Sequence, residues 1–296
     1  MGPVPAASAV RTPPSASPTL DPQAHASDKP FEALELISRP ATGERRPVSL
    51  LFVHGINVGA WVWSGRFLDH FAEAGFDAYA VSLRGHGRSW GSERIREWGL
   101  ADYVDDLFQT TGRIPGPVVL VGHSLGGAVV QKFVQGGGRA AGMALLASVP
   151  PWGLAPSAFR MAVRSPRMLA VLMEMSSGRR PPADKGLLRR MLFTPDTADD
   201  ELDWFISLVG PESPRLSSEL QGCPPLAPAP WLAPKVFVLG GMDDAIIPSD
   251  EVWRAGLYYG CIPELVPGLG HMVMSGNRWE KSAVLLRRWL ESTFGT

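Results

Sequence analysis

A serine between two glycines, in the stretch Gly122-His123-Ser124-Leu125-Gly126, is the first candidate for chemistry in this sequence. Four apolar residues precede the stretch, and a segment of helical pattern follows it. A serine in such a turn lies at the N-terminus of the helix, where the main-chain amide of Leu125 faces a developing negative charge. The pattern fits a nucleophilic serine. It also fits a glycine-rich turn that lets a helix pack closely on a strand.

A serine hydroxyl needs a base to become a nucleophile, and the sequence offers six histidines. His271 stands in the loop PGLGHM, directly after the last predicted strand. Catalytic groups collect on the loops at the carboxyl ends of strands in open α/β sheets. We therefore predict His271 as the base. His54, His86 and His123 lie in glycine-flanked loops, where we expect them to pack or to hydrogen bond.

The base in turn needs a carboxylate that orients its second ring nitrogen and stabilises the imidazolium. In the stretch VFVLGGMDDAIIP, an apolar strand pattern runs into two adjacent aspartates, Asp243 and Asp244. We predict Asp244 as the orienting carboxylate, with Asp243 as the alternative. The other aspartate is expected to stabilise the turn or to cap the helix that follows.

An oxyanion needs more than one donor, because the loss of one costs about 2.7–4 kcal/mol of barrier. The stretch LLFVHGIN, residues 50–57, is another apolar strand pattern that ends in His-Gly. The glycine lets the backbone that follows it approach the serine turn. We predict the main-chain amides of Ile56 and Leu125 as the two donors.

Short β patterns alternate with helical patterns from about residue 33 onward. The central β patterns are apolar throughout, which is typical of strands covered on both faces in a parallel sheet. An apolar stripe over 99–111 and a segment over 64–74 that ends at Gly75 predict two of the helices. The alternation predicts an α/β fold with a doubly wound, mostly parallel sheet. The predicted strands are 33–38, 48–53, 77–82, 118–121, 142–147, 235–239 and 262–266.

Residues 151–234 interrupt this alternation with several proline clusters and no convincing strand. A segment of this length is too long for a bare loop in a compact domain. We predict a helical insertion after the sixth strand, placed on a core formed by residues 31–150 and 235–296. Residues 1–30 are rich in Pro, Ala and Ser and contain no apolar run, which predicts a disordered tail.

The composition excludes several classes of function. The net charge of −1 gives no basic field for nucleic acid. No segment approaches the ~20 apolar residues of a membrane span, and the N-terminal residues lack the apolar run of a signal peptide, so we expect a cytoplasmic protein. Cys223 and Cys261 form neither a metal-ligand spacing nor a disulfide framework, and whether they pair stays open.

With these pieces in place, the chain resembles the α/β-hydrolase superfamily over roughly residues 33–294. Five loops carry the resemblance, in the family's order: FVHGIN, SLRGHGRS, GHSLGG, GGMDDAIIP and PGLGHM. The resemblance implies the α/β-hydrolase fold, a helical lid at 151–234 after the sixth strand, and a catalytic triad of Ser124, His271 and Asp244. It implies no metal and no organic cofactor.

The resemblance also excludes some branches of the superfamily. Epoxide hydrolases and haloalkane dehalogenases of this fold carry an aspartate where this chain has Ser124. The stretch WVW at 61–63 is similar to plant methylesterases and to the related hydroxynitrile lyases. We expect acyl transfer to water, and a serine hydrolase that acts on a hydrophobic ester or lactone.

The substrate is predicted from the insertion, whose aromatic and methionine side chains suit an adaptable apolar pocket or, alternatively, the insertion's own core. The predicted substrate-binding residues are Trp152, Met161, Met168, Met173 and Phe205. Between residues 160 and 190, eight basic side chains stand against two acidic ones. This bias suggests an acidic carrier protein, coenzyme A or an acidic lipid surface as partner, and hence a thioesterase as the second hypothesis. A non-hydrolytic lyase of the same fold is the third.

Overall fold

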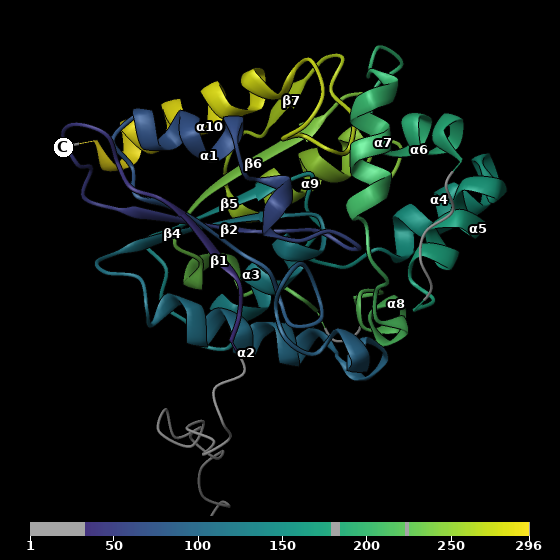
Figure 1. The fold of residues 1–296 in the computed structure, drawn as a ribbon, viewed down its shortest axis with the longest axis horizontal. Helices are drawn as coiled ribbons and strands as arrows, with labels where there is room; N and C mark the ends of the chain where they lie inside the picture. The colour runs from purple at the N-terminus through teal and green to yellow at the C-terminus, as the bar shows by residue number, and fades with distance from the viewer. Residues whose placement is uncertain (1–32, 179–183, 223–224, 296) are drawn as a thin grey trace, which may run out of the picture. The chain divides into compact units, whose positions relative to one another are not determined.

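A single seven-stranded sheet organises the part of the chain described by the computed structural model, residues 33–178, 184–222 and 225–295 (Figure 1). The predicted disordered tail at 1–30 lies outside these residues. The strand order is β1-β3-β2-β4-β5-β6-β7, and every neighbouring pair is parallel except β1 with β3. The prediction of an α/β fold with a mostly parallel sheet is confirmed. The strands are β1 (Leu36–Arg39), β2 (Ser49–Val53), β3 (Ala78–Val81), β4 (Val118–His123), β5 (Gly142–Leu146), β6 (Lys235–Gly241) and β7 (Glu264–Val266).

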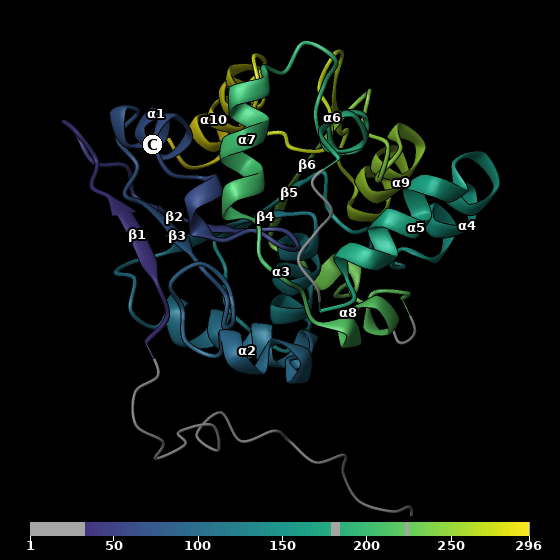
Figure 2. The ribbon, with the colours of Figure 1, turned by 45° about the vertical axis from the view of Figure 1, so that its right-hand side comes forward.

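Helices cover both faces of the sheet, which explains the continuous apolar runs of its central strands. Every residue of β2, β4 and β5 is buried. Figures 1 and 2 show α1 and α10 packed together over one face, with α2 and α3 over the opposite face. Burial on both faces removes the alternation that a half-exposed strand would show. A further helix, α9, packs on β6. The bounds of these helices are α1 (Arg66–Glu73), α2 (Leu100–Thr111), α3 (Leu125–Gln135), α9 (Ser249–Tyr259) and α10 (Trp279–Phe294).

The strand order reverses direction between β2 and β4. The chain passes from β2 to β3 on one side of β2, and β4 then lies on the other side. The loops that leave the carboxyl ends of these two strands therefore diverge, and such a point is where open α/β sheets bind ligands. The loop after β2 carries Ile56, and the turn after β4 carries Ser124.

The helical insertion follows β5, the fifth strand, so the predicted position after the sixth strand is wrong. All five strands predicted before residue 151 are present, and the sixth predicted strand, 235–239, follows the insertion as part of β6. Within residues 33–296 the insertion and the sheet belong to one compact unit, and Figure 2 shows the insertion helices grouped at one end of the strands. The insertion helices are α4 (Ala155–Arg164), α5 (Pro166–Met175), α6 (Lys185–Leu192), α7 (Asp199–Leu208) and α8 (Pro214–Glu219).

None of the helices in the described ranges is both long and apolar enough to cross a membrane.

The first turn of α3 packs directly against the carboxyl end of β2. A Cβ atom at Gly126 would stand 2.2 Å from the carbonyl oxygen of Val53 and 2.6 Å from that of His54. Both neighbours are main-chain atoms, which cannot move aside as a flexible side chain would. Glycine at this position therefore sets how closely the helix approaches the strand.

Replacing Gly126 by alanine should lower the free energy of unfolding by about 1–3 kcal/mol, because the added methyl group overlaps two main-chain oxygens. In an unobstructed helix the same change is favourable by about 1 kcal/mol. Gly112→Ala is the matched control, since Gly112 has a helical φ of −64° and a Cβ there would meet no atom closer than 3.5 Å. Urea denaturation of both variants measures the difference, and equal stabilities would contradict this account of the packing.

Candidate active site

Ser124 occupies a strained turn between β4 and α3. Its φ is +51°, in the left-handed region that side chains other than glycine rarely adopt. Two main-chain hydrogen bonds hold this conformation: the amide of Ser124 donates to Leu146 O over 3.2 Å, and the amide of Gly127 donates to Ser124 O over 3.0 Å. The turn presents the hydroxyl at the carboxyl edge of the sheet and at the N-terminus of α3.

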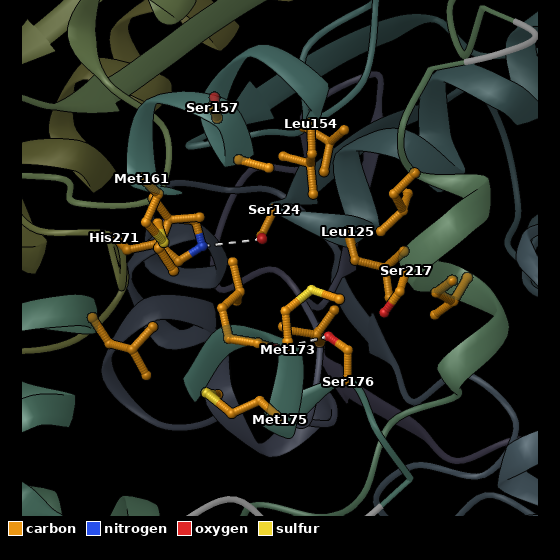
Figure 3. Close-up of a pocket in the computed structure, with 18 of the residues that line it drawn as sticks. Ser124, Leu125, Leu154, Ser157, Met161, Met173, Met175, Ser176, Ser217 and His271 are labelled. Atoms are coloured by element: carbon orange, nitrogen blue, oxygen red, sulfur yellow. Dashed lines mark hydrogen bonds between the residues drawn. The ribbon is translucent and has the colours of Figure 1, made fainter. Parts of the chain in front are cut away.

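The structure brings together the three side chains predicted to form the triad. The distance between Ser124 Oγ and His271 Nε2 is 3.0 Å (Figure 3), and that between His271 Nδ1 and Asp244 Oδ2 is 2.8 Å. Asp244 follows β6 and His271 follows β7, so three strand ends supply the three groups. The alternative carboxylate, Asp243, is exposed to solvent. In this order of hydrogen bonds the imidazole can take the serine proton while the carboxylate holds the other ring nitrogen.

Asp244 is itself fixed by the turn in which it stands. Its Oδ1 accepts hydrogen bonds from the main-chain amides of Ile246 and Ile247, over 2.7 and 2.9 Å. These two bonds leave Oδ2 directed at His271. The side chains of Asp244 and His271 are almost fully buried, so water does not compete for the bond between them.

The loop after β2 approaches the serine turn through Gly55. A Cβ atom there would stand 2.9 Å from His123 Nδ1 and 3.1 Å from Ser124 Cβ. The next residue, Ile56, lines the same cavity as Ser124 and Leu125. Leu125 is the first residue of α3, so its amide has no acceptor within the helix. Among the described residues, the amide of Ile56 also donates to no protein acceptor. These are the two amides predicted as oxyanion donors.

His54 and His123 are buried and hydrogen-bonded, as predicted. His123 donates from Nε2 to the carbonyl oxygen of His271 over 2.9 Å, and thereby supports the loop that carries the predicted base. Burial, together with the neighbouring His271, holds the pKa of His123 well below its ordinary value. His54 accepts a hydrogen bond from the amide of Leu83 over 3.0 Å. Burial lowers the pKa of His54 to about 3, so both rings are neutral.

A buried carboxylate that sequence analysis missed lies beneath the loop after β2. Glu212, between α7 and α8, is completely buried. Its oxygens accept hydrogen bonds from His86 Nε2 over 3.1 Å and from the hydroxyl of Tyr103 over 2.9 Å. His86 thus hydrogen bonds as predicted. Glu212 stands in a short proline-containing stretch, GPESP, with no strand pattern beside it, so only the three-dimensional packing identifies it.

An apolar cavity opens above Ser124, with its walls formed largely by the insertion (Figure 3). Of the predicted substrate-binding residues, Met161, Met173 and Phe205 line it. Trp152 and Met168 are not among the described lining residues, and the indole of Trp152 donates to Glu251 instead. Aliphatic side chains of the insertion that the sequence did not single out also contribute to the walls: Leu154, Leu169, Leu172, Leu216 and Leu220.

Acidic residues neutralise much of the basic charge of the insertion. Lys185 and Arg189 pair with Asp203 and Asp199, which lie on α7. The prediction of a basic surface considered residues 160–190 alone, whereas the fold brings these acidic partners beside them. Two further pairs join Arg160 to Asp250 on α9 and Arg167 to Asp184. Arg179 and Arg180, which contributed to the prediction, lie outside the described residues.

The described part of the chain contains no group of three or more His, Cys, Asp or Glu side chains placed to hold a metal ion. Cys261 is half-buried with a free thiol. Cys223, its only possible partner in the sequence, lies outside the described residues.

The fold and the site define a class of α/β proteins with a serine at a strand-to-helix turn, paired to a histidine and an aspartate from later strand ends. A model of the alpha/beta hydrolase family matches residues 50–281, and the chain belongs to this family.

Curated relatives match only part of the chain. A pheophorbidase of Raphanus sativus is 35% identical over 87 residues, which cover 29% of this chain and 32% of that protein. A non-heme haloperoxidase of Rhodococcus erythropolis is 32% identical over 112 residues, 37% of this chain and 39% of the relative. The chain therefore aligns with less than half the length of either relative.

Solved structures match nearly the whole fold at low sequence identity. The monoacylglycerol lipase of Paleococcus ferrophilus superposes with a TM-score of 0.65 at 18% identity. The superposition covers 88% of this chain and 99% of the lipase. This likeness shows the shared fold.

The His86–Glu212 pair makes the stability of the protein depend on pH. Burial alone lowers the pKa of His86, but the charge and hydrogen bond of Glu212 raise it above its ordinary 6.5. Burial alone raises the pKa of Glu212, but His86 and the other donors bring it below its ordinary 4.5. His86 therefore stabilises the fold below pH 6.5, an effect lost as pH rises through its raised pKa. Glu212 stabilises it above pH 4.5, an effect lost as pH falls through its lowered pKa.

The stability advantage of the wild type over Glu212→Gln should be greatest between pH 4.5 and 6.5, where both contributions are present. It should decrease as the pH rises above 6.5 and through the raised pKa of His86, by at most about 1.4 kcal/mol per pH unit, because His86 loses its proton. Urea denaturation of both proteins across this range measures the difference. A difference that does not change with pH would contradict the assignment of a charged pair.

Proposed function

We propose that the protein is a serine hydrolase that cleaves a carboxylic ester or lactone of a hydrophobic small molecule through an acyl-enzyme intermediate. The observation that carries the proposal is the hydrogen-bonded chain from Ser124 through His271 to Asp244, with successive distances of 3.0 and 2.8 Å. This chain lies at the base of an apolar cavity. The fold shared with a monoacylglycerol lipase supports ester chemistry.

In the proposed reaction, Ser124 Oγ attacks the substrate carbonyl carbon while His271 Nε2 takes the hydroxyl proton. Asp244 accepts the hydrogen bond from His271 Nδ1 and stabilises the imidazolium. The tetrahedral intermediate then expels the alcohol, which receives the proton from His271, and leaves an acyl group on Ser124. In the second half of the reaction, water attacks this ester while His271 takes its proton. The bond between the acyl carbon and Ser124 Oγ then breaks, Oγ receives the proton back from His271, and the acid leaves.

The amides of Ile56 and Leu125 are the proposed donors to the oxyanion. They lie on opposite sides of the topological switch point, one after β2 and one at the start of α3. The N-terminal end of α3 adds a positive dipole at the same position. Neither donor moves a proton, so both act without reorganisation as charge develops on the carbonyl oxygen.

The insertion is the proposed lid over this site and the proposed source of substrate selectivity. Met161, Met173 and Phe205 face the cavity together with leucines of α4, α5 and α8. Such a lining favours an apolar acyl or alcohol group, and thioether side chains adapt to irregular shapes. A neutral ester or lactone is preferred over a carrier-bound thioester because ion pairs occupy Arg160, Arg167, Lys185 and Arg189.

Ser124→Ala should abolish hydrolysis of p-nitrophenyl esters, and Asp244→Asn should lower kcat by about 10⁴-fold, because the amide reverses the tautomer of the base. Asp243→Asn is the matched control, because Asp243 is exposed and adjacent, and its kcat should stay at the wild-type value. Initial rates over a range of substrate concentrations measure all three. Full turnover by Ser124→Ala, or equal losses for the two aspartate variants, would refute the proposed mechanism.

Turnover of an acyl-coenzyme A should respond to added salt no more steeply than turnover of a neutral ester, because ion pairs occupy four basic side chains of the insertion: Arg160, Arg167, Lys185 and Arg189. Rates for both substrates at ~0.05 M and ~0.5 M salt make the comparison, since the higher concentration screens exposed charges. A steep fall for the coenzyme A thioester alone would instead support the thioesterase hypothesis.

A further inference from the structure

Among the described residues, the hydrogen bonds between the insertion and the loop after β2 converge on Asn57. Its main-chain oxygen accepts a hydrogen bond from the amide of Gly210 over 2.9 Å. Its side-chain amide donates to the carbonyl oxygens of Met175 and Gly210, both over 2.9 Å. Its main-chain amide points at Glu212 Oε2, 3.4 Å away. Asn57 adopts a φ of +62°, a conformation that asparagine tolerates better than most residues.

The carboxylate that meets this amide is held from three sides. His86 and Tyr103 donate to it from the core, and the amide of Ser213 donates to Oε1 over 2.7 Å. The guanidinium of Arg84, two residues before His86, is engaged by Asp106 at 2.7 Å. Glu212 is therefore a buried charge whose partners fix its position, and within the described residues its hydrogen bond to the loop after β2 is with Asn57.

We propose that Glu212 is a positioning residue that orients the Ile56 amide for the oxyanion by fixing Asn57, the residue that follows Ile56. This inference rests on the proposed function, because the orientation of that amide matters only if it stabilises an oxyanion. It also assigns the insertion a second role besides lining the cavity. The insertion supplies the support for one of the two proposed donors.

The geometry leaves the Ile56 amide little freedom. On its N-terminal side, Gly55 lies so close to His123 and Ser124 that no side chain would fit between them. On its C-terminal side, the planar peptide that joins Ile56 to Asn57 is held through the Asn57 amide. Loss of the charge at Glu212 weakens the second restraint only. The ground-state pocket stays intact, whereas the donor that acts in the transition state becomes less well aligned.

Glu212→Gln should lower kcat for a p-nitrophenyl ester by about 10–100-fold, a fraction of the 10²–10³ lost when an oxyanion donor is removed outright. KM should change by less than about 3-fold, because the interaction is made in the transition state. Glu219→Gln is the matched control. Glu219 also ties the insertion to the core, through the amide of Leu100 at 2.6 Å, but does not contact the loop after β2. Its variant should keep the wild-type kcat.

Hydrogen–deuterium exchange supplies a readout that does not depend on activity. In Glu212→Gln, the amides of residues 55–58 should exchange faster than in the wild type, and in Glu219→Gln they should not. If Glu212→Gln does not fold, Tyr103→Phe removes one hydrogen bond from the same carboxylate. It should lower kcat by about 5-fold at unchanged KM.

Three results would overturn the inference: a wild-type kcat in Glu212→Gln, equal losses in Glu212→Gln and Glu219→Gln, or a change confined to KM. Failure of the proposed function is recognised separately. If the proposed function is wrong, the wild type itself shows no esterase activity, and the positioning role fails with it. Failure of the positioning role alone leaves wild-type activity in place and the Glu212→Gln kcat equal to it.

Discussion

The close contact between the first turn of α3 and the carboxyl end of β2 is the constraint on which the rest of the site depends. Gly126 faces the main-chain oxygens of Val53 and His54 with no room for a side chain. This contact brings the N-terminus of α3 beside the loop after β2, so that Ile56 and Leu125, from different parts of the chain, line the same cavity as Ser124. The positive φ of Ser124 is the strain that accompanies this arrangement. Main-chain hydrogen bonds with Leu146 of β5 and with Gly127 of α3 hold this conformation.

Buried polar groups around this contact are neutral or paired, and each one locates a piece of main chain. His123 carries no charge and holds the carbonyl group of His271. Asp244 is held by two amides before it meets His271. Glu212 is paired with His86 and reaches the amide of Asn57. The hydrogen bonds of these three side chains therefore offset the free-energy cost of burying them, and they also determine the geometry of the main chain.

The parts of the site that were predictable from sequence are those that follow a strand directly. Ser124, Asp244 and His271 each come after an apolar run and beside glycines, so local pattern and the topology of a parallel sheet together indicate their meeting point. Glu212 has no such neighbourhood, and only the packing of the insertion brings it to Asn57. The prediction of the cavity lining was only partly correct, for a similar reason. The side chains that face Ser124 are decided by how α4, α5 and α8 rotate against the core, which the sequence of one helix does not specify. The count of charges over residues 160–190 left out acidic residues on α7 and α9 that pair with basic side chains of the insertion.

The insertion contributes to the site in two physically separate ways. Helices α4, α5 and α8 present apolar side chains to the cavity, and these side chains make no hydrogen bonds that the loop after β2 needs. The carbonyl group of Met175 at the end of α5, together with Gly210 and Glu212 between α7 and α8, makes directional, buried contacts with Asn57 that do not involve the cavity-facing side chains. Apolar packing tolerates changes of volume at modest cost, whereas a buried hydrogen-bonded charge does not tolerate the loss of a partner. Substrate range can therefore vary along α4, α5 and α8 while the support of the Ile56 amide stays constant, because the two functions rest on different interactions of the same insertion.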